Sequence, residues 1–559
     1  MEIPRTMKNG QPSAYLSITL HAHLPYVIHH GTWPHGQEWL HEAVAETYLP
    51  LLGVLRRLER DGLSLKANLS LSPVLLEQLR HPTFVEEFPK YIERKLVYAR
   101  EDENYFRQNG EQRFAETAVF WQQFYDRTLR EFYDLDRNLV AAFRHFQDAG
   151  AIDIITSAAT HGYLPLLGTD ESMTAQLLTG VAAHERHLGR KPRGIWIPDC
   201  GYRPAGTWSA SVRAGAEESS WPPFRRIGVE EALAAAGIEF FFVDTHMIEN
   251  KVQWEGDLGA TYRPSLVEGP LSHAHPVAVF ARDPKTGLQV WSGDSGYPAD
   301  PHYLEFHKKR WPGGLRYWQV TLARSDMALK APYFPEQAEE RARVHAEHFV
   351  GLIYDALKGG FDHKPPPILS ALYDAELFGH WWFEGPLWLE HVARMIAKDD
   401  FPIALTTASD YLDKYPAEVS VALPEGSWGK NGNNEVWLND ETSWTWSHIY
   451  RVERVLREVT SDARWRDGGW GERIAKQMAR EVLLLESSDW QFLITTAAAR
   501  DYAEKRFSGH LAEFVELEML WAEFVANGRL AEVGEKALTE LEERDGLFAE
   551  IDPGLWAAR

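Results

Sequence analysis

Six short apolar runs, most of them ending in polar residues, constrain the fold more than any other feature of this chain. They cover residues 14–20, 63–71, 151–157, 194–197, 239–243 and 368–372. Helical patterns separate several of the runs, for example over residues 39–60 and 335–357. This alternation is typical of a parallel sheet or barrel, in which the residues that follow the strands gather on one face. We therefore predict an α/β protein with its functional site at the carboxyl ends of the strands.

Two regions interrupt this alternation. Residues 74–149 are charged and aromatic with helical spacing, which predicts a helical insertion between the second and third strands. From about residue 427 onward the chain is mostly helical, with predicted helices over residues 472–486, 489–506 and 510–526. Residues 421–434 (VALPEGSWGKNGNN) are the best linker candidate. The expected domains are a barrel in two segments (1–73 and 150–420), a helical insertion domain (74–149) and a C-terminal helical domain (421–559).

The composition limits the partners and the compartment. The formal net charge of −23 argues against nucleic acid, and no apolar run approaches the roughly 18 residues of a membrane span. Cys200 is the only cysteine and the N-terminal residues contain no apolar signal core, so we expect a cytoplasmic location. The 22 tryptophans, 21 tyrosines and 26 phenylalanines indicate either a large aromatic core or an extended surface for flat apolar faces, such as those of sugars.

Residues 373–385 (YDAELFGHWWFEG) carry the clearest chemical signal. Asp374 and Glu376 lie at the end of a predicted strand, and Trp381 and Trp382 follow closely. A carboxyl group among indole rings loses hydration, so its pKa rises and it can hold a proton near neutral pH, as a general acid must. The structural alternative is a strand-to-helix turn with an acid at its start and tryptophans in the core.

Other polar residues follow the remaining strands. His21 and His23 alternate at the end of the first run, a spacing that is more typical of hydrogen-bonding residues than of a metal site. Further candidates for the same face are His161, Asp199, Asp244, His246 and Arg282. The sequence contains no HExxH motif, glycine-rich phosphate loop or GxSxG motif. Two acids from different strands, with aromatic walls, are the usual apparatus of glycoside chemistry.

Five segments resemble, in order, the motifs of glycoside hydrolase family 57, and most closely those of its 1,4-α-glucan branching enzymes. They are HAHLPY, TSAATHGYLPLL, GIWIPDCGYRP, YDAELFGHWWFEG and NEVWLNDETSWTW. The similarity continues through HGTWPHGQEWLHEAVAETYLPLL, WSGDSGYPADPHYLEFHKK and LLLESSDWQFLITT, so it covers nearly the whole chain. The resemblance implies a (β/α)7 barrel with a helical insertion and a C-terminal helical domain. It also implies a retaining double displacement on α-glucan without a metal or cofactor.

The resemblance also implies a role for each site residue. Asp199 falls at the nucleophile position, and Asp374 at that of the general acid/base. The residues implied for the donor-sugar site are His21, His23, His161, Asp244 and His246. The candidate glucan-stacking residues are Trp33, Trp382, Trp428, Trp437 and Trp446. We expect the two acids, the three histidines, Asp244 and His246 to meet in one pocket.

This chain departs from the family pattern at two positions. The nucleophile position holds Asp199 where the family has glutamate, so the carboxylate is expected to stop about 1 Å short of the anomeric carbon, a displacement that can cost roughly 10²-fold in rate. Three outcomes remain open: a backbone shift that restores attack, a wider gap that admits water and favours inversion, or glucan binding with little turnover. Leu304 stands where the pattern has arginine, either as a surface change or as the loss of a carboxylate partner.

Three functions therefore remain open at this stage. The first is an α-glucan branching enzyme, which must exclude water from its intermediate; residues 252–269, with Trp254 and Tyr262, are the candidate cover. The second is a weakly active or inactive glucan-binding paralogue. The third is an α-amylase or 4-α-glucanotransferase on the same scaffold. The oligomeric state, the transferred chain length and the acceptor preference are not predicted.

Overall fold

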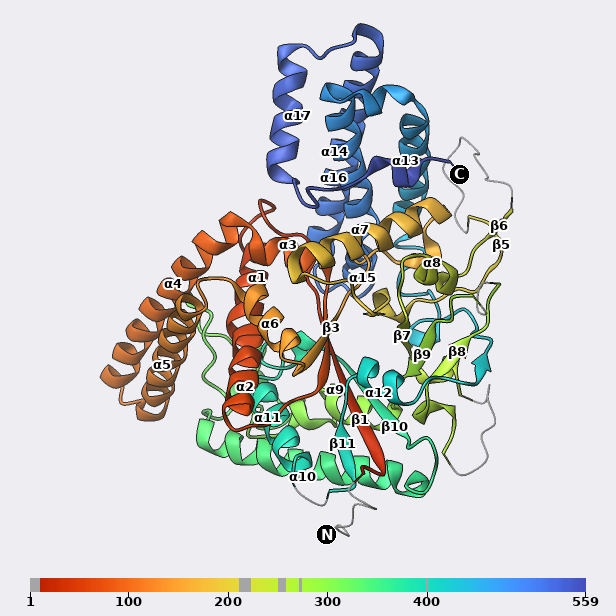
Figure 1. Cartoon of the computed structure of the whole chain (residues 1–559). Helices are drawn as coiled ribbons and strands as arrows, with labels where there is room; N and C mark the ends of the chain where they lie inside the picture. Colours follow the sequence, from red (N-terminus) through yellow and green to blue (C-terminus); the bar gives the residue numbers. More distant parts are fainter. Residues whose placement is uncertain (1–10, 211–222, 250–257, 271–273, 399–400, 559) are drawn as a thin grey trace.

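The computed structural model describes residues 11–210, 223–249, 258–270, 274–398 and 401–558 (Figure 1). At its centre lies a ring of parallel strands. These are β1 (Ala14–Ala22), β2 (Ala67–Leu71), β3 (Ile152–Ile155), β4 (Gly194–Ile195), β7 (Phe240–Val243), β9 (Ala278–Ala281) and β10 (Ile368–Asp374). The six runs predicted from the sequence all correspond to strands, whereas β9 was not predicted.

The ring closes because two sheets are joined at both edges. One sheet has the order β10-β1-β2-β3, and the other contains β9-β7-β4. Parallel bridges from Thr156 to Ile195 and from Arg282 to Ser370 join β3 to β4 and β9 to β10. All these pairings are parallel, so the described strands form the predicted (β/α)7 barrel. Short strands outside the ring are β5 (Gly206–Trp208), β6 (Phe224–Arg226), β8 (Ser265–Val267), β11 (Ile403–Leu405) and β12 (Ser420–Val421).

The inside of the barrel changes from apolar to polar toward the carboxyl ends of its strands. Aromatic residues that include Trp196, Phe240 and Phe280 form a separate buried cluster with residues of β1, β3 and β10. Such a cluster can gather only where the strands of a ring face one another. Farther along β1 the same strand face carries Ser17, Thr19 and His21, all of them buried. The period-two alternation of β1 therefore leads directly from a packed core to the functional end.

Helices cover the barrel on its outside (Figure 1). They are α1 (Gln37–Ala43), α2 (Leu49–Arg60), α3 (Pro73–Arg80), α6 (Leu139–Asp148), α7 (Asp170–Leu188), α8 (Val229–Ala235), α9 (Pro284–Trp291), α10 (Pro335–Leu357), α11 (Gly385–Ile396) and α12 (Ala408–Lys414). Local chemistry sets their ends. In α7 the Thr169 side chain accepts a hydrogen bond from the Ser172 N–H, and Gly189 ends the helix in the left-handed conformation with φ of 79°.

Between β2 and β3 the chain forms a helical hairpin of α4 (Pro82–Gln108) and α5 (Gln112–Asp134), seen in orange at the left of Figure 1. Gly110, with φ of 74°, lies in the turn between them. Several contacts attach the hairpin to residues 310–317 of the barrel region. The Trp121 indole N–H donates to the Arg316 carbonyl at 2.6 Å, while Arg310 and Tyr317 each contact the Asp102 carboxylate at 2.7 Å.

The C-terminal part of the chain is helical (blue in Figure 1). It comprises α13 (Ser443–Ser461), α14 (Gly469–Leu485), α15 (Asp489–Thr495), α16 (Arg500–Asn527) and α17 (Glu532–Arg544). The helix predicted over residues 489–506 is wrong, because the chain breaks after Thr495, where Ala497 has φ of 55°. The break predicted between Arg506 and His510 is also wrong: α16 runs through Gly509, where a side chain would meet open space. The domain boundaries stay a prediction.

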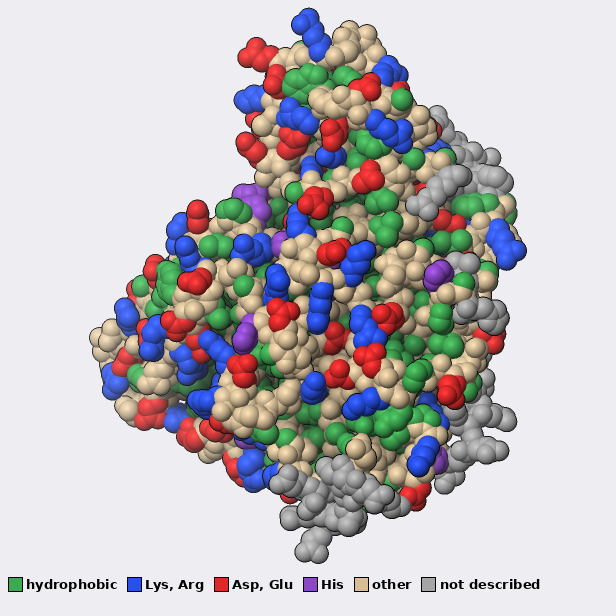
Figure 2. All heavy atoms as spheres, viewed as in Figure 1, with side chains coloured by type: hydrophobic (Ala, Val, Ile, Leu, Met, Phe, Trp, Pro, Cys, Tyr) green, Lys and Arg blue, Asp and Glu red, His purple; other side chains and the backbone are tan. Residues whose placement is uncertain are grey.

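The surface carries charges of both signs. Figure 2 shows Lys and Arg side chains interspersed with Asp and Glu over the visible face. Within the described part of the chain, no helix is long and apolar enough to cross a membrane.

Candidate active site

A large cleft of about 1720 Å³ opens at the carboxyl ends of the barrel strands. Asp199 and Asp374 both line it, together with His21, His23 and His161. Asp374 is the last residue of β10 and Asp199 follows β4, so the two acids come from nearly opposite sides of the ring. The parallel topology therefore brings five of the seven expected pocket residues into one cleft.

Asp374 lies in the register position opposite His21 of β1. Burial raises its pKa well above the usual range, and the nearby charges of Glu376 and Asp199 raise it further, while Arg282 opposes the shift. The next acid, Glu376, accepts hydrogen bonds from the Tyr48 hydroxyl and, at 3.2 Å, from the His23 backbone N–H. These shifts favour the protonated form of Asp374, which is the form that can donate a proton to a leaving group.

The turn after Asp374 requires a glycine. Gly379 has φ of 113°, and a Cβ atom there would lie 1.8 Å from the Glu46 carbonyl oxygen. Next to it, the His380 Nδ1 lies 2.9 Å from the Glu46 carboxylate, which also pairs with Arg316 at 2.9 Å. These contacts fix the backbone that carries Trp381 away from the core and into the cleft.

Asp199 has a left-handed backbone, with φ of 56° and ψ of 26°, and Cys200 follows with φ of 51°. A positive φ is uncommon for residues other than glycine. The Trp428 indole N–H donates to Oδ1 at 3.3 Å, and Oδ2 lies 3.9 Å from Nδ1 of His161. Burial raises the pKa of Asp199 to about 6, against the opposing effect of the Ser488 hydroxyl. Asp199 is therefore mainly ionised at neutral pH and can act as a nucleophile.

His21 and His161 form a hydrogen-bonded pair on the floor of the cleft. Their Nε2 atoms lie 3.0 Å apart, so one ring donates to the other. The second nitrogen of His21 lies 2.9 Å from the Ser70 hydroxyl, and that of His161 lies 2.8 Å from the Ser488 hydroxyl. Burial lowers the pKa of both imidazoles well below the usual range. They are therefore neutral polar groups at neutral pH.

His23 connects the barrel to the C-terminal helices. Its Nδ1 lies 2.9 Å from the Ser72 hydroxyl, and its Nε2 lies 3.0 Å from Oδ2 of Asp489 at the start of α15. Burial alone would raise the pKa of Asp489, but the charge and hydrogen bond of His23 outweigh it and lower the pKa to about 2. Sequence reasoning missed Asp489 and Ser488 as site residues; the only signal was the family-like segment LLLESSDWQFLITT.

The side chains of His23, His161 and Asp489 lie within metal-binding distance of one another, but they are arranged for hydrogen bonding. Their possible ligand atoms all lie within 4.8 Å. However, the rings of His23 and His161 stack face to face at 4.1 Å with an angle of 14° between planes, so their in-plane lone pairs do not converge on one point. Each imidazole nitrogen also has a protein partner. This donor set suits sugar hydroxyl groups better than a cation.

Arg282 lines the cleft, whereas Asp244 and His246 are not among its lining residues. Arg282 pairs with Asp244 at 2.6 Å and lies over the Trp428 ring at 5.6 Å. His246 is exposed, with Nε2 3.2 Å from the Gly432 carbonyl. In this structure Asp244 therefore positions Arg282, and His246 contacts the segment that carries Trp428.

The five predicted stacking tryptophans divide into two groups. Trp33, Trp428 and Trp437 border the cleft; Trp33 is 60% exposed, whereas Trp437 is only 1% exposed and packs in the core. Trp382 and Trp446 are 1% and 0% exposed and belong to the core, so neither presents a face to a ligand in this structure. Composition could not distinguish the two groups, because exposure depends on the packing of distant segments.

Two further expectations concern the barrel rim. Leu304 is 3% exposed and its N–H donates to Glu384 at 3.1 Å, so its interpretation as a surface change is wrong. Of the candidate cover, residues 252–257 with Trp254 lie outside the described residues. Tyr262 is described, and its hydroxyl donates to Asp283 at 2.8 Å.

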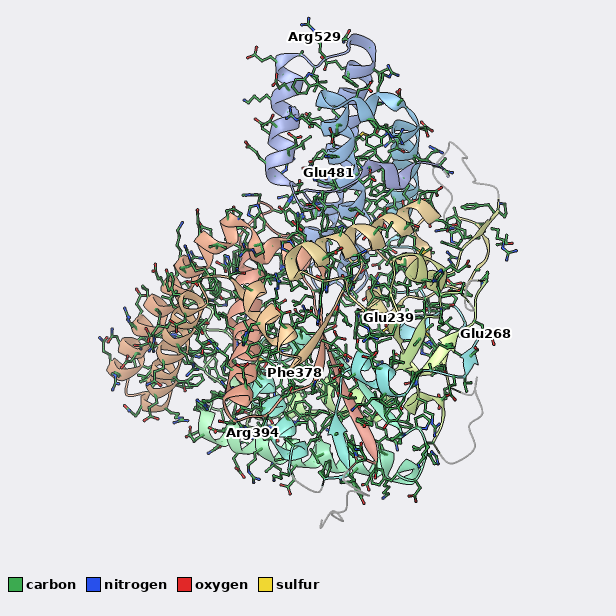
Figure 3. All side chains as sticks on the ribbon, in the orientation of Figure 1. Glu239, Glu268, Phe378, Arg394, Glu481 and Arg529 are labelled. Atoms are coloured by element: carbon green, nitrogen blue, oxygen red, sulfur yellow. The ribbon has the colours of Figure 1, made fainter. Side chains whose placement is uncertain are left out.

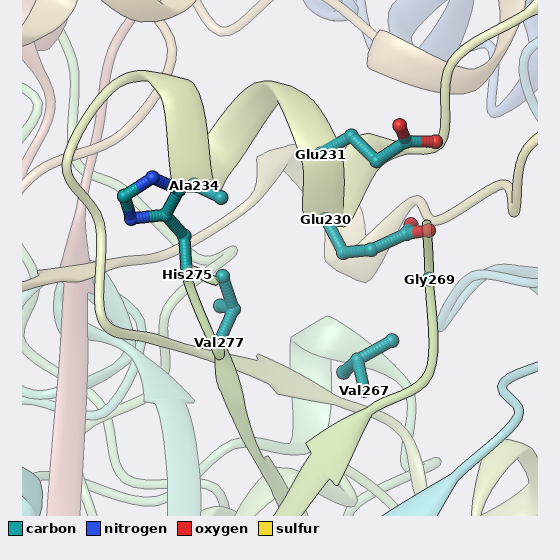
Figure 4. Close-up of a pocket in the computed structure, with 7 residues that line it drawn as sticks. All are labelled: Glu230, Glu231, Ala234, Val267, Gly269, His275 and Val277. Carbon is teal, nitrogen blue, oxygen red and sulfur yellow. The ribbon is translucent and has the colours of Figure 1, made fainter. Parts of the chain in front are cut away.

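A second hollow lies between α8 and the strands β8 and β9 (Figure 4). Glu230 and His275 are among its lining residues, and its volume is only about 10 Å³. That is room for about one water molecule, so this hollow is no candidate for a substrate site.

Comparison with known proteins agrees with this geometry. The model of "Glycosyl hydrolase family 57" matches residues 17–424. This chain belongs to that family. A model of the "1,4-alpha-glucan branching enzyme, C-terminal" region matches residues 448–556 of this family 57 protein.

Individual family 57 relatives resemble the chain over almost its whole length. A 1,4-alpha-glucan branching enzyme of Thermococcus kodakarensis is 41% identical over 97% of this chain and 78% of the relative. The crystal structure of a branching enzyme from Pyrococcus horikoshii is 40% identical, with a TM-score of 0.89 over 98% of this chain and 97% of that one. The alpha-amylase AmyC of Thermotoga maritima is 29% identical, with a TM-score of 0.80 over 98% and 99% of the two chains.

Proposed function

We propose that this family 57 protein is a 1,4-α-glucan branching enzyme that acts by a retaining double displacement. The observation that carries the proposal is the pair of acids facing one cleft: Asp374, whose pKa burial raises well above its usual range, and Asp199, whose pKa of about 6 leaves it mainly ionised at neutral pH. Two carboxyl groups whose pKa values differ in this way match the roles of acid and nucleophile. The similarity to branching enzymes in both the barrel and the C-terminal region supports the same function.

In the first half of the reaction a carboxylate oxygen of Asp199 attacks the anomeric carbon of an α-1,4-linked glucose. The bond between that carbon and the leaving oxygen breaks, and Asp374 gives its proton to the leaving oxygen. The products are a glycosyl ester on Asp199, a shortened glucan with a free 4-hydroxyl group, and an ionised Asp374. His21, His23 and His161 lie between the two acids' strands, where they can hydrogen-bond to the sugar hydroxyl groups.

In the second half the 6-hydroxyl group of an acceptor glucan attacks the same carbon. Asp374 takes the hydroxyl proton, the ester bond to Asp199 breaks, and an α-1,6 bond forms. Two inversions retain the configuration at the anomeric carbon. We place the reaction in glycogen-type polymer synthesis in the cytoplasm, on amylose-like α-glucans.

The test is the product formed from amylose. The purified protein should reduce iodine staining, and a debranching enzyme should then release new linear chains that report the α-1,6 bonds. Hydrolysis is the second candidate, because of the similarity to the amylase AmyC; it predicts free reducing ends without new branches. Unchanged staining with retained glucan binding would instead indicate an inactive paralogue and contradict the proposal.

A further inference from the structure

One arm of the cleft carries exposed aromatic faces that the catalytic chemistry does not use. Trp33, Trp311 and Trp381 line it and are 60%, 59% and 53% exposed, and Phe306 lies beside them. Large indole faces seldom remain this open to water without a ligand or partner. We name these four residues the aromatic platform.

The aromatic platform lies on the Asp374 side of the cleft. The backbone N–H of Trp381 donates to the backbone carbonyl of Glu376, two residues after Asp374, at 3.1 Å. The Trp381 ring lies against the Phe306 ring, with the two centroids 4.3 Å apart. Trp428, by contrast, donates to Asp199 on the other side of the ring. The cleft therefore has different aromatic walls beside the nucleophile and beside the general acid.

The structure holds Trp311 firmly in position. Trp311 lies in a turn in which the Arg310 N–H donates to the Leu315 carbonyl at 2.8 Å. Two contacts with α4 fix this turn: Arg310 pairs with Asp102 at 2.7 Å, and the buried Lys95 ammonium donates to the Gly313 carbonyl at 3.0 Å. Trp311 then meets Trp33 edge to face, with ring centroids 5.7 Å apart. The helical hairpin thus contributes to the cleft by presenting this ring.

We propose that the aromatic platform binds the acceptor glucan chain, with Trp311 and Trp381 as its main stacking faces. The proposal rests on the function proposed above. In both half-reactions Asp374 must contact the oxygen of the chain that leaves or enters, so that chain lies on the Asp374 side. Charged side chains at the edge of the arm, such as Glu42, Arg94 and Lys309, suit a ligand with flat apolar faces and hydroxyl-rich edges.

The experiment separates the two half-reactions with maltotriosyl fluoride as donor and maltoheptaose as acceptor. Attack of Asp199 breaks the C–F bond and releases fluoride with its electron pair, so this step needs no acceptor chain. In Trp311→Ala and Trp381→Ala, fluoride release without acceptor should stay within about twofold, whereas the acceptor concentration for half-maximal transfer should rise roughly tenfold. Trp311→Phe and Trp381→Phe keep a flat ring and should recover much of the loss.

Tyr133→Ala is the matched control, because it removes a 50% exposed aromatic ring from α5 outside the cleft. It should change neither readout. Unchanged acceptor dependence in both alanine variants would overturn the proposal, and so would an equal loss of fluoride release and transfer.

Calorimetry with maltoheptaose separates failure of the platform from failure of the proposed activity. If the unmodified protein releases no fluoride, the proposed activity fails, and the binding measurement then tests the platform alone. Weaker binding in both alanine variants, with recovery in the phenylalanine variants, supports a glucan site at the platform. Binding equal to that of the unmodified protein overturns it.

Discussion

Two clusters of buried ionisable side chains lie in this protein, and they differ in how their charges are arranged. The first is the cleft cluster, which includes Asp199, Asp374 and Glu376. The second, the sealed cluster, lies among the C-terminal helices, where Figure 3 labels Glu481 in α14. Its acids and histidines are Glu481, His510, Glu513, Asp545 and His30.

The sealed cluster pairs acids with histidines, of which His30 is neutral at neutral pH because burial lowers its pKa to about 4. His30 lies 2.6 Å from Asp545, and His510 lies 2.8 Å from Glu481. Burial opposes the charge of His510, but its hydrogen bond to the Glu481 carboxylate and the nearby Glu513 carboxylate outweigh it and raise its pKa to about 9. In the same way the hydrogen bond from His30 holds the pKa of Asp545 well below its usual range, despite burial. The cluster connects the segment after β1, which also carries His23 and Trp33, to α14 and α16.

The cleft cluster instead places like charges near one another. The charges of Glu376 and Asp199 add to the effect of burial on Asp374, and the charge of Asp489 adds to that on Asp199. Such crowding costs stability in the empty protein but leaves a proton ready for transfer. Burial of ionisable side chains alone therefore does not mark a catalytic site; access to a ligand does.

Replacing one aspartate in each cluster should have the largest effect, on the branching rate in the cleft cluster and on the free energy of unfolding in the sealed cluster. Asp374→Asn removes the transferable proton, so the branching rate should fall by roughly 10²–10⁴-fold. Binding of maltoheptaose should remain nearly intact, because the side chain keeps its size. Branch points counted after debranching give the rate, and calorimetry gives the binding. Near-full activity would move the acid/base role to Glu376 or another group.

Asp545→Asn should instead lower the stability of the protein and leave its activity unchanged. It removes a buried carboxylate that hydrogen-bonds to His30 and lies near the charge of His510, so we expect a loss of roughly 3–5 kcal/mol in the free energy of unfolding with normal activity per folded molecule. Because the folded protein lowers the pKa of Asp545, the stabilisation is present above about pH 4 and is lost as the pH falls further. Urea midpoints of both proteins should therefore converge in acid. A constant difference at all pH values would exclude the charge as its cause.

Asp199→Glu tests whether the nucleophile is too short. The added methylene should close a gap of about 1 Å to the anomeric carbon and raise the branching rate by up to roughly 10²-fold. Asp199→Ala, the control, should be inactive. A clear drop with glutamate would show instead that the left-handed backbone at Asp199 and Cys200 is adapted to aspartate.

The barrel was predictable from the sequence because its strands are continuous apolar runs that end in polar residues. His21 and His23 could be placed on one side of a strand from their spacing alone. Strand β9 (AVFA) was not predicted, although it is no shorter than β3 or β7 and Arg282 follows it directly, as polar residues follow other strands. Asp489 could not be placed, because it reaches His23 only through the packing of a helix 466 positions away in the chain. Pairing at that distance leaves no periodic signal.

The smallest effect on the branching rate should come from replacing Asp489. This residue borders the cleft cluster but pairs with a histidine, as the acids of the sealed cluster do. Its negative charge is one of the causes that raise the pKa of Asp199 to about 6. Branching should therefore slow as the pH falls through about 6, because protonated Asp199 cannot attack. In Asp489→Asn that decline should move to lower pH, since the carboxylate of Asp199 is then easier to ionise.

The same variant should lose roughly tenfold in rate at neutral pH, because an amide holds His23 less firmly than the carboxylate does at 3.0 Å.

Asp545→Asn is the control for the pH dependence, since it removes a buried carboxylate far from Asp199. It should leave the decline of the branching rate in acid at the same pH. The measurement is the pH dependence of the branching rate at low glucan concentration, which reports groups of the free enzyme. A decline that stays in place in Asp489→Asn would mean that Asp489 acts on catalysis only by positioning His23. In that case the like-charge crowding of the cleft cluster would be confined to Asp199, Asp374 and Glu376.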